Sequence, residues 1–315
     1  MVGLNQRAAS LCEKMERDSQ LLGVAVRRNE AGTRVMDCGV HARGGLEAGL
    51  LLAEICLAGL GKVQLAYDGA NGSWPAVTVV TDEPVAACMA SQYAGWQLTG
   101  REYFAMGSGP FRAAAGREDL FDAIGMRERN VAHAVGVLET AQLPTPEVCV
   151  DIAAACRVAP EKLTLLAART ASHAGNLQIV ARSVETALHK MHELEFDIRK
   201  VSNAMGTCPL PPVAADDLAG IGRTNDAVLY AGQVTLWLRA DDEELDSLGP
   251  KIPSCASADF GEPFATIFER YDKDFYRIDP SLFSPAQITL INIESGNCFR
   301  FGQVRADIAR KSFSG

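Results

Sequence analysis

The sequence lacks a long uninterrupted apolar segment. Its longest apolar stretch, from Ala48 to Leu60, is broken by Glu54. A helix needs about 20 consecutive apolar residues to cross a bilayer, so the sequence predicts no membrane span. The N-terminal residues are amphipathic from the start and show no apolar signal-peptide core. We therefore expect a cytoplasmic protein.

Runs of lysine or arginine are also absent. The chain has 39 acidic and 30 basic residues, which gives a formal net charge of −9. Binding to a phosphate backbone requires a basic face. The charge balance therefore predicts no nucleic-acid partner.

Motifs for metals and for several classes of catalysis are missing as well. No two of the nine cysteines are separated by the two-residue gap of a zinc or redox motif, and the five histidines are scattered. No Gly-x-Ser-x-Gly elbow, zinc-protease helix or calcium loop occurs. Most cysteines lie in apolar runs, where a free thiol behaves as a small hydrophobe. These absences predict a protein without a metal, kept in a reducing compartment.

What the sequence does contain is a regular alternation of strand and helix patterns. Candidate hairpins span Leu22 to Cys38 and Ile288 to Val304, and strands and helices alternate between them. This alternation predicts an α/β fold, and 315 residues suggest two lobes. If both terminal hairpins belong to one lobe, the lobes are residues 1–115 plus 251–315 and residues 116–250, with approximate boundaries.

One segment departs from this alternation. Residues 204–226 contain three prolines and three glycines, which predicts an irregular loop. Long loops inside compact domains are often functional. Residues 227–238, which follow, are expected to form one or two strands.

The most informative element is a helix predicted from Asn176 to Leu194. Its apolar positions form one buried stripe: Leu177, Val180, Val184, Leu188 and Met191. A second stripe with the same period is polar and covers an arc of about 80°: Gln178, Arg182, Glu185, His189 and His192. The polar stripe is either a functional surface or a solvated face whose Arg–Glu pair contributes about 0.2–0.5 kcal/mol. Spacing alone favours the solvated face.

Three loops offer further candidate contacts. Gly107, Ser108 and Gly109 end a predicted strand, and a turn of this kind leaves backbone N–H groups for an anion or carbonyl. Arg223, Thr224, Asn225 and Asp226 form a polar run, and Asp37 to Val40 begins a loop that contains Gly44 and Gly45. Each pattern suits ligand binding, and each suits an ordinary turn equally well.

Taken together, segments along nearly the whole chain resemble methenyltetrahydromethanopterin cyclohydrolases. The matching segments include residues 37–40, 48–50, 91–96, 104–110, 180–186, 211–214, 222–226 and 274–280. The resemblance implies a homotrimer whose subunits have two α/β lobes side by side, with an interlobe pocket for the pterin. It also implies hydrolysis of 5,10-methenyltetrahydromethanopterin to the 5-formyl compound, without a metal or cofactor.

The resemblance also assigns residues. Arg182 and Glu185 match the family's catalytic arginine and glutamate, which lie three residues apart in one helix. Gly107 to Gly109 and Arg223 to Asn225 match pocket loops, and Gln178 is a further candidate for the pocket wall. His189 and His192 are left as structural residues.

Several alternatives remain open at this stage. The substrate could carry the full or the dephospho pterin tail, and the flux could run toward methanogenesis or formaldehyde oxidation. A pterin-binding carrier without turnover is the non-enzymatic alternative.

Overall fold

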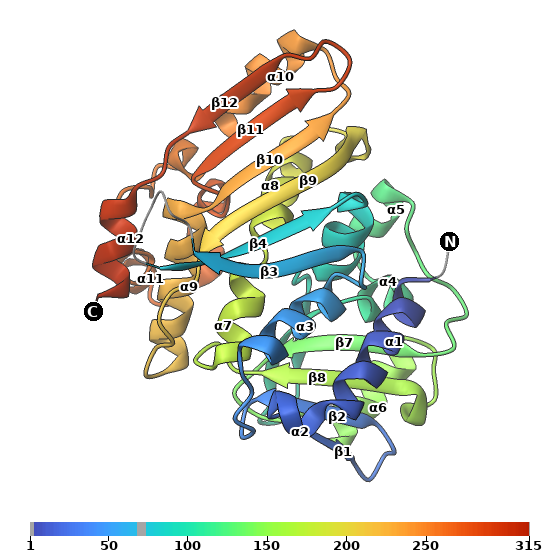
Figure 1. Cartoon of the computed structure of the whole chain (residues 1–315). Helices are drawn as coiled ribbons and strands as arrows, with labels where there is room; N and C mark the ends of the chain where they lie inside the picture. Colours follow the sequence, from blue (N-terminus) through green and yellow to red (C-terminus); the bar gives the residue numbers. More distant parts are fainter. Residues whose placement is uncertain (1–2, 68–73, 315) are drawn as a thin grey trace. The chain divides into compact units, whose positions relative to one another are not determined.

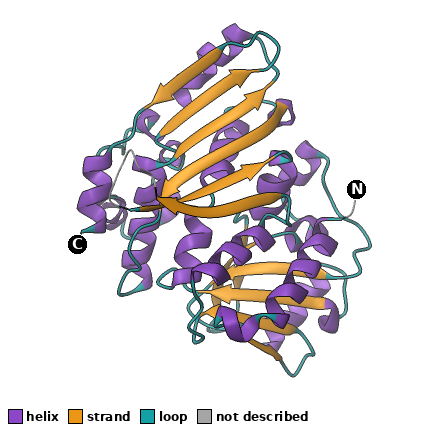
Figure 2. Ribbon diagram, in the orientation of Figure 1, coloured by secondary structure: helices purple, strands orange, loops and turns teal. Residues whose placement is uncertain are grey.

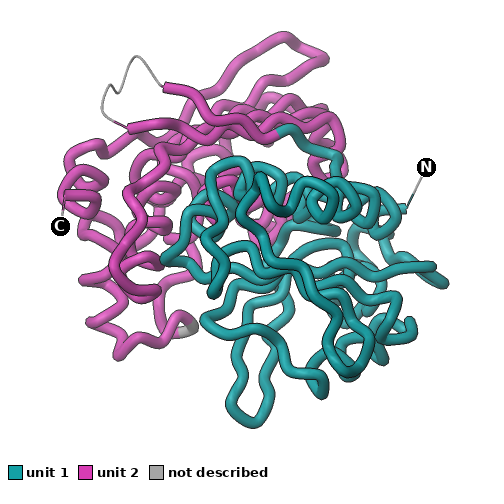
Figure 3. The backbone as a smooth tube through the Cα atoms, turned by 60° about the horizontal axis from the view of Figure 1, so that its bottom comes forward, with its two compact units in different colours: residues 1–62, 86–178 teal, residues 63–85, 179–315 magenta. Residues whose placement is uncertain are grey.

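The computed structural model describes residues 3–67 and 74–314 (Figure 1). The chain forms two compact units: unit 1 contains residues 1–62 and 86–178, and unit 2 contains residues 63–85 and 179–315 (Figure 3). Each is built on a six-stranded mixed sheet within the described residues. The predicted α/β class is confirmed, and both units are discontinuous in sequence.

Unit 1 is organised around a sheet with the strand order β1-β2-β8-β7-β6-β5. Its strands are β1 (Ala25–Arg28), β2 (Arg34–Gly39), β5 (Trp96–Thr99), β6 (Phe104–Ser108), β7 (Ala134–Glu139) and β8 (Leu163–Ala168). The three central strands β2, β8 and β7 run parallel, and the outer neighbours pair antiparallel. The first predicted hairpin is therefore confirmed as β1 and β2.

Helices cover both faces of this sheet (Figure 2). They are α1 (Leu4–Arg17), α2 (Ser19–Leu22), α3 (Leu46–Cys56), α4 (Phe111–Ala115), α5 (Leu120–Ile124), α6 (Pro146–Ala155), α7 (His173–Val180), the π-helix η1 (Val85–Gln92) and the 3-10 turn η2 (Pro160–Lys162).

Alternation along the strands divides the core of unit 1 between the two faces. Met36 packs in the cluster that α1 and α3 contribute to, and its neighbour Val35 packs in the cluster that contains α6 residues such as Ile152. Successive strand side chains point to opposite faces, so strands that are apolar throughout need helices on both sides. This explains why every residue of β2 and β8 is buried.

Unit 2 has the strand order β12-β11-β10-β9-β4-β3. Its strands are β3 (Gly61–Tyr67), β4 (Pro75–Thr81), β9 (Val201–Pro209), β10 (Gln233–Leu238), β11 (Gln287–Asn292) and β12 (Cys298–Gly302). Its α-helices are α8 (Ser183–Glu193), α9 (Asp217–Ala231), α10 (Asp242–Leu248), α11 (Phe264–Arg270) and α12 (Ala306–Phe313). Short 3-10 turns complete it: η3 (Ile198–Lys200), η4 (Gly249–Lys251), η5 (Ser254–Ala256), η6 (Phe275–Arg277) and η7 (Pro280–Leu282).

Helices α8 and α9 pack against one face of the unit 2 sheet, mainly on β9 and β10. The alternation on β10, where Val234, Leu236 and Leu238 are buried and the residues between them are half-buried, fits a sheet with one covered face. In the described part of the chain, no helix is long and apolar enough to span a membrane.

The sequence-based division of the chain differs from the observed one. The C-terminal hairpin, β11 and β12, joins β10 in the unit 2 sheet, whereas the N-terminal hairpin lies in unit 1. Residues 116–178 belong to unit 1, and residues 251–315 to unit 2. Hairpin patterns are local, but the sheet that a hairpin joins is decided by partner strands far away in sequence.

The predicted loop at residues 204–226 is wrong. Strand β9 extends to Pro209 and helix α9 begins at Asp217, so only a short connection separates them. Gly206 lies within β9 because Ser183 and Val184 of α8 pack against it, and a Cβ atom there would collide with the Ser183 hydroxyl. The expected strand at residues 227–238 is also shortened, because α9 continues to Ala231 before β10 begins.

Candidate active site

The predicted helix from Asn176 to Leu194 is two helices. Helix α7 ends at Val180 and α8 begins at Ser183, with Arg182 as its N-cap residue. The Arg182 amide donates to the Ile179 carbonyl at 3.1 Å, which tightens the backbone at the joint, and the Thr186 amide donates to the Arg182 carbonyl at 2.9 Å. Arg182 therefore lies at a helix N-terminus, and Glu185 lies in the first turn of that helix.

The polar stripe is not a solvated face. Gln178, Arg182 and Glu185 have only 2%, 8% and 5% of their surface exposed. Burying charged side chains is costly unless they are paired and hydrogen-bonded. A helix surface used only for solvation would not carry that cost, so the burial favours the functional interpretation. The apolar stripe is confirmed, since all five of its members are fully buried.

Local sequence explains where each helix begins. The Ser172 hydroxyl accepts a hydrogen bond from the Gly175 amide at 3.0 Å, and α7 starts at His173, earlier than the predicted start at Asn176. The first turn of α8 has an acidic residue, Glu185. A carboxylate is favoured there because the amide dipoles point their positive end toward it.

The two histidines of the stripe lie further along α8. His189 and His192 are partly buried, and His189 Nε2 lies 3.6 Å from a carboxylate oxygen of Glu193. Among the described residues, no group of three or more His, Cys, Asp or Glu side chains is arranged to hold a metal ion.

The turn from Gly107 to Gly109 lies at the end of β6 in unit 1. Gly109 has φ +99°, a conformation that favours glycine. Its amide donates to the Ser91 carbonyl at 2.7 Å, and the Ser108 hydroxyl is 3.3 Å from both the Val137 carbonyl and Cys56 Sγ. The turn is therefore fixed by internal hydrogen bonds.

The backbone amides of the loop after Asp37 are also hydrogen-bonded within the protein. The Asp37 carboxylate accepts four backbone N–H groups, from residues 39–42, at 2.7–3.0 Å. The amides that could have bound a ligand anion are therefore occupied by this side chain.

Arg223, Thr224 and Asn225 lie within α9, and the structure corrects their expected place in a loop before a strand. The Thr224 hydroxyl and the Asn225 amide donate to the Gly220 and Ile221 carbonyls of their own helix, at 2.9 and 2.8 Å. Arg223 Nη1 donates to the Pro212 carbonyl at 3.3 Å. Of the predicted site residues, Arg182 and Glu185 share unit 2 with these three, and Gln178 shares unit 1 with the glycine turn.

The next residue, Asp226, is fully buried. Its carboxylate accepts the Phe264 amide at 2.7 Å, which ties α9 to the start of α11. Burial raises the pKa of Asp226 to about 7.

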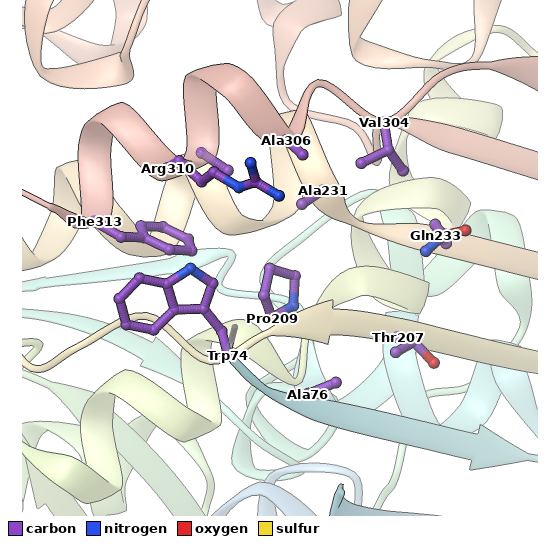
Figure 4. Close-up of a pocket in the computed structure, with 11 residues that line it drawn as sticks. Trp74, Ala76, Thr207, Pro209, Ala231, Gln233, Val304, Ala306, Arg310 and Phe313 are labelled. Atoms are coloured by element: carbon purple, nitrogen blue, oxygen red, sulfur yellow. The ribbon is translucent and has the colours of Figure 1, made fainter. Parts of the chain in front are cut away.

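Unit 2 also encloses a cavity of about 40 Å³ between α12 and the strands β4, β9 and β10 (Figure 4). Trp74 and Phe313 meet edge to face beside it, with ring centroids 5.6 Å apart. The space holds a few waters at most, and its lining includes no residue of α8. A space of this size is too small for a pterin.

Comparison with known proteins decides the family. The family model described as Cyclohydrolase (MCH) matches residues 3–313. A relative from Rhodopirellula baltica, named methenyltetrahydromethanopterin cyclohydrolase, is 48% identical over 288 residues, 90% of this chain and 86% of the relative. The chain belongs to this family.

Two further methenyltetrahydromethanopterin cyclohydrolases show how widely the similarity extends. The protein of Xanthobacter autotrophicus is 45% identical and covers 100% of this chain and 93% of its own length. The protein of Methanosarcina barkeri is 40% identical, and the match covers 99% of this chain and 98% of that protein. As a member of this cyclohydrolase family, the chain is a hydrolase acting on a cyclic amidine C–N bond.

No sequence pattern singled out Arg112, which is 1% exposed and follows the glycine turn. Its signal was weak: one arginine in a short Ala-rich helix, with Glu118 six residues later. The contacts that make it notable join segments far apart in sequence, and periodicity does not show them.

Proposed function

We propose that this chain hydrolyses 5,10-methenyltetrahydromethanopterin, or its dephospho form, to the 5-formyl compound in a reversible step of one-carbon metabolism. The observation that carries the proposal is the burial of Arg182 and Glu185 at the first turn of α8, in a chain that belongs to the cyclohydrolase family across residues 3–313.

The reaction needs a base and a route for two protons. The substrate is an amidinium-like cation, and water attacks its bridging carbon. Glu185 accepts one proton of the water as the C–O bond forms. The C–N bond then breaks, Glu185 returns that proton to the leaving nitrogen, and the second proton of the water leaves to solvent as the formyl group forms.

The position of Glu185 suits this role. A carboxylate held in the first turn of a helix and largely shielded from water is fixed in place and exerts its charge in a low-dielectric environment. The same negative charge stabilises the cationic substrate before attack. When the carboxylate accepts the proton of the water it becomes neutral, at the same step at which the substrate loses its positive charge.

Arg182 supplies the opposite charge. Its guanidinium would stabilise the oxygen of the tetrahedral intermediate or orient the Glu185 carboxylate. As the N-cap residue of α8 it is attached to the same rigid turn as Glu185. Because they share a turn, the two side chains keep the same relative position through the reaction.

We assign substrate contacts to Gly107, Ser108, Gly109, Gln178, Arg223, Thr224 and Asn225. The Ser108 and Thr224 hydroxyls already donate to backbone carbonyls of the protein. These positions therefore contact the substrate mainly through van der Waals packing and not through new hydrogen bonds. Arg223 is the exception, since a guanidinium carries five N–H donors and its Nη1 bonds leave capacity for a substrate oxygen.

The proposal includes no metal or cofactor, a homotrimeric assembly and a cytoplasmic location. A reducing compartment agrees with nine cysteines that all carry free thiols.

The deciding experiment follows the methenyl chromophore after mixing with the enzyme in the presence of a chelator. We expect rapid loss of the chromophore with methenyltetrahydromethanopterin and much slower loss with methenyltetrahydrofolate. Tight binding with an unchanged spectrum would instead identify a carrier. Loss of activity on metal stripping, restored by a metal, would contradict the proposed mechanism.

A further inference from the structure

Arg112 is one of the largest fully buried side chains in the described structure, and it is charged. It lies in α4 of unit 1, two residues after Pro110. An unpaired guanidinium in such a place would be strongly unfavourable. The groups that the Arg112 guanidinium contacts therefore indicate its structural role.

The guanidinium makes a two-point contact with the Glu118 carboxylate. Nε donates to one oxygen at 2.9 Å, and Nη2 pairs with the other. Arginine is suited to this because its planar fork matches both carboxylate oxygens. Gly95 makes room for the pair, since a Cβ atom there would collide with Glu118.

The remaining donor, Nη1, reaches the end of the π-helix η1. It donates to the Met89 carbonyl at 3.2 Å and to the Ser91 carbonyl at 3.1 Å. The rings of Tyr93 and Phe121 lie 4.9 and 5.3 Å from the guanidinium carbon, at cation–π distance.

The Ser91 carbonyl is the link to the glycine turn. It accepts both Arg112 Nη1 and the Gly109 amide, the latter at 2.7 Å. The Arg112 amide itself donates to the Gly109 carbonyl at 3.3 Å. One side chain thus joins the last turn of η1, the turn from Gly107 to Gly109, and Glu118.

We infer that Arg112 is a positioning residue for the substrate-binding turn: it sets the backbone of Gly107 to Gly109 through the Ser91 carbonyl and has no contact of its own with the pterin. π-Helical segments are rare and occur frequently at functional sites, which agrees with η1 holding this turn. The inference rests on the proposed function, because it takes the turn to be part of the pterin site.

The test compares two buried arginines of unit 1. Arg34 is also buried and pairs with Glu13 and Glu16 at 2.8 and 2.7 Å, but its fork contacts neither η1 nor the glycine turn. Arg112→Lys and Arg34→Lys therefore remove the same fork and keep the same charge. Both should lower the melting temperature.

Only Arg112→Lys should weaken substrate binding. We expect its KM and its substrate Kd to rise at least tenfold, with kcat changed less than threefold, because the loss falls on binding rather than on the reacting groups. Arg34→Lys should leave KM and Kd within twofold of wild type. Equal changes in KM for the two variants would overturn the inference.

Two further measurements keep the test decisive. If Arg112→Lys does not accumulate as folded protein, Glu118→Gln, which weakens the same fork, must reproduce the rise in KM, and an unchanged KM would overturn the inference. If wild type binds the methenyl substrate without turnover, the proposed function fails, while a tenfold difference in Kd between the two lysine variants would still support the role of Arg112. If wild type does not bind the substrate, both fail.

Discussion

At the scale of single residues, the central question is which buried charges act on the substrate. Glu185 and Glu193 make a matched pair, because both lie on α8 but only Glu185 is buried. Glu193 is exposed and faces His189. If substitution lowers activity at Glu185 but not at Glu193, the loss is due to catalysis and not to a general effect of charge on this helix.

We predict that Glu185→Gln lowers kcat on the order of 100-fold or more, the usual cost of removing a general base. The amide keeps the size of the side chain, so the far-UV circular dichroism spectrum should not change. Glu193→Gln should retain nearly full activity in the same chromophore assay. Near-wild-type turnover by a folded Glu185→Gln protein would exclude Glu185 as the base.

A second prediction concerns Asp226 and the dependence of stability on pH. Burial raises its pKa from 3.8 to about 7, so between these values the folded protein binds a proton that the unfolded chain releases. Its contribution to the free energy of unfolding is therefore largest below about pH 4 and is lost as the pH rises through 7. A pKa that differs by one between the folded and unfolded chain corresponds to about 1.4 kcal/mol, which puts the loss at a few kcal/mol.

Asp226→Asn should remove this dependence, because the amide oxygen can still accept the Phe264 amide but does not ionise. We expect urea unfolding to show a gain of a few kcal/mol at pH 8 and little change at pH 4.5. Asp307→Asn is the control, since the Arg305 side chain lowers the pKa of Asp307 to about 2 and its removal should bring no gain at pH 8. A loss of stability at pH 8 in Asp226→Asn would contradict the assignment.

At the scale of elements, the joint between α7 and α8 shows what periodicity detects and what it misses. The apolar stripe continues across the joint with every member buried. The spacing of apolar residues therefore does not show that the helix is interrupted. The break is a local change of backbone at Arg182. The Arg–Glu spacing was visible in the sequence, but its burial depends on packing that the sequence pattern does not contain.

Strand β9 and helix α9 show the opposite error. Glycine and proline usually mark loops, yet Gly206 is required in β9 by the close approach of α8, and Gly222 lies in α9 against Ala265. Tertiary packing overrode the local preference at both positions. The strand β8 has no such conflict, since its apolar run contains neither glycine nor proline.

We predict opposite effects at these two glycines. In Gly206→Ala the new methyl group would overlap Ser183 Oγ and lie 2.9 Å from Val184 Cγ2, so we expect about 1–3 kcal/mol of destabilisation. It should also lower kcat, because the displaced residues begin the turn that carries Glu185. Thermal melts and the chromophore assay measure the two effects.

Gly222→Ala serves as the comparison. A Cβ atom there would lie 3.4 Å from the Ala265 Cβ, an ordinary contact, and alanine is favoured over glycine in a helix by up to about 1 kcal/mol. The melting temperature should rise or stay constant. A fall as large as that of Gly206→Ala would show that the helix packs more tightly than the described contacts indicate.

At the scale of the whole molecule, composition and alternation predicted the α/β class and two discontinuous lobes, but not their boundaries. The boundaries depend on pairings such as β4 with β9 and β10 with β11, and a strand pattern does not identify its partner. The family resemblance supplied the reaction, which the residues alone left open.

Assembly gives a prediction at this scale. We expect sedimentation equilibrium to report three times the chain mass of 33.7 kDa at micromolar concentration in a reducing buffer. Because the exposed thiols are Cys255 and Cys298, a Cys255→Ser and Cys298→Ser double variant should keep that mass. A single-chain mass at all concentrations would contradict the trimer.

The pairing of β4 with β9 also sets the order of events during synthesis. Thr78 and Thr207 face each other across this pair, 129 residues apart in the chain. A ribosome adds roughly 5–20 residues per second, so β4 emerges roughly 6 to 26 s before its partner strand exists. Throughout that interval β4 has only β3 as a neighbouring strand, so the sheet of unit 2 can be completed only after β9 has been made.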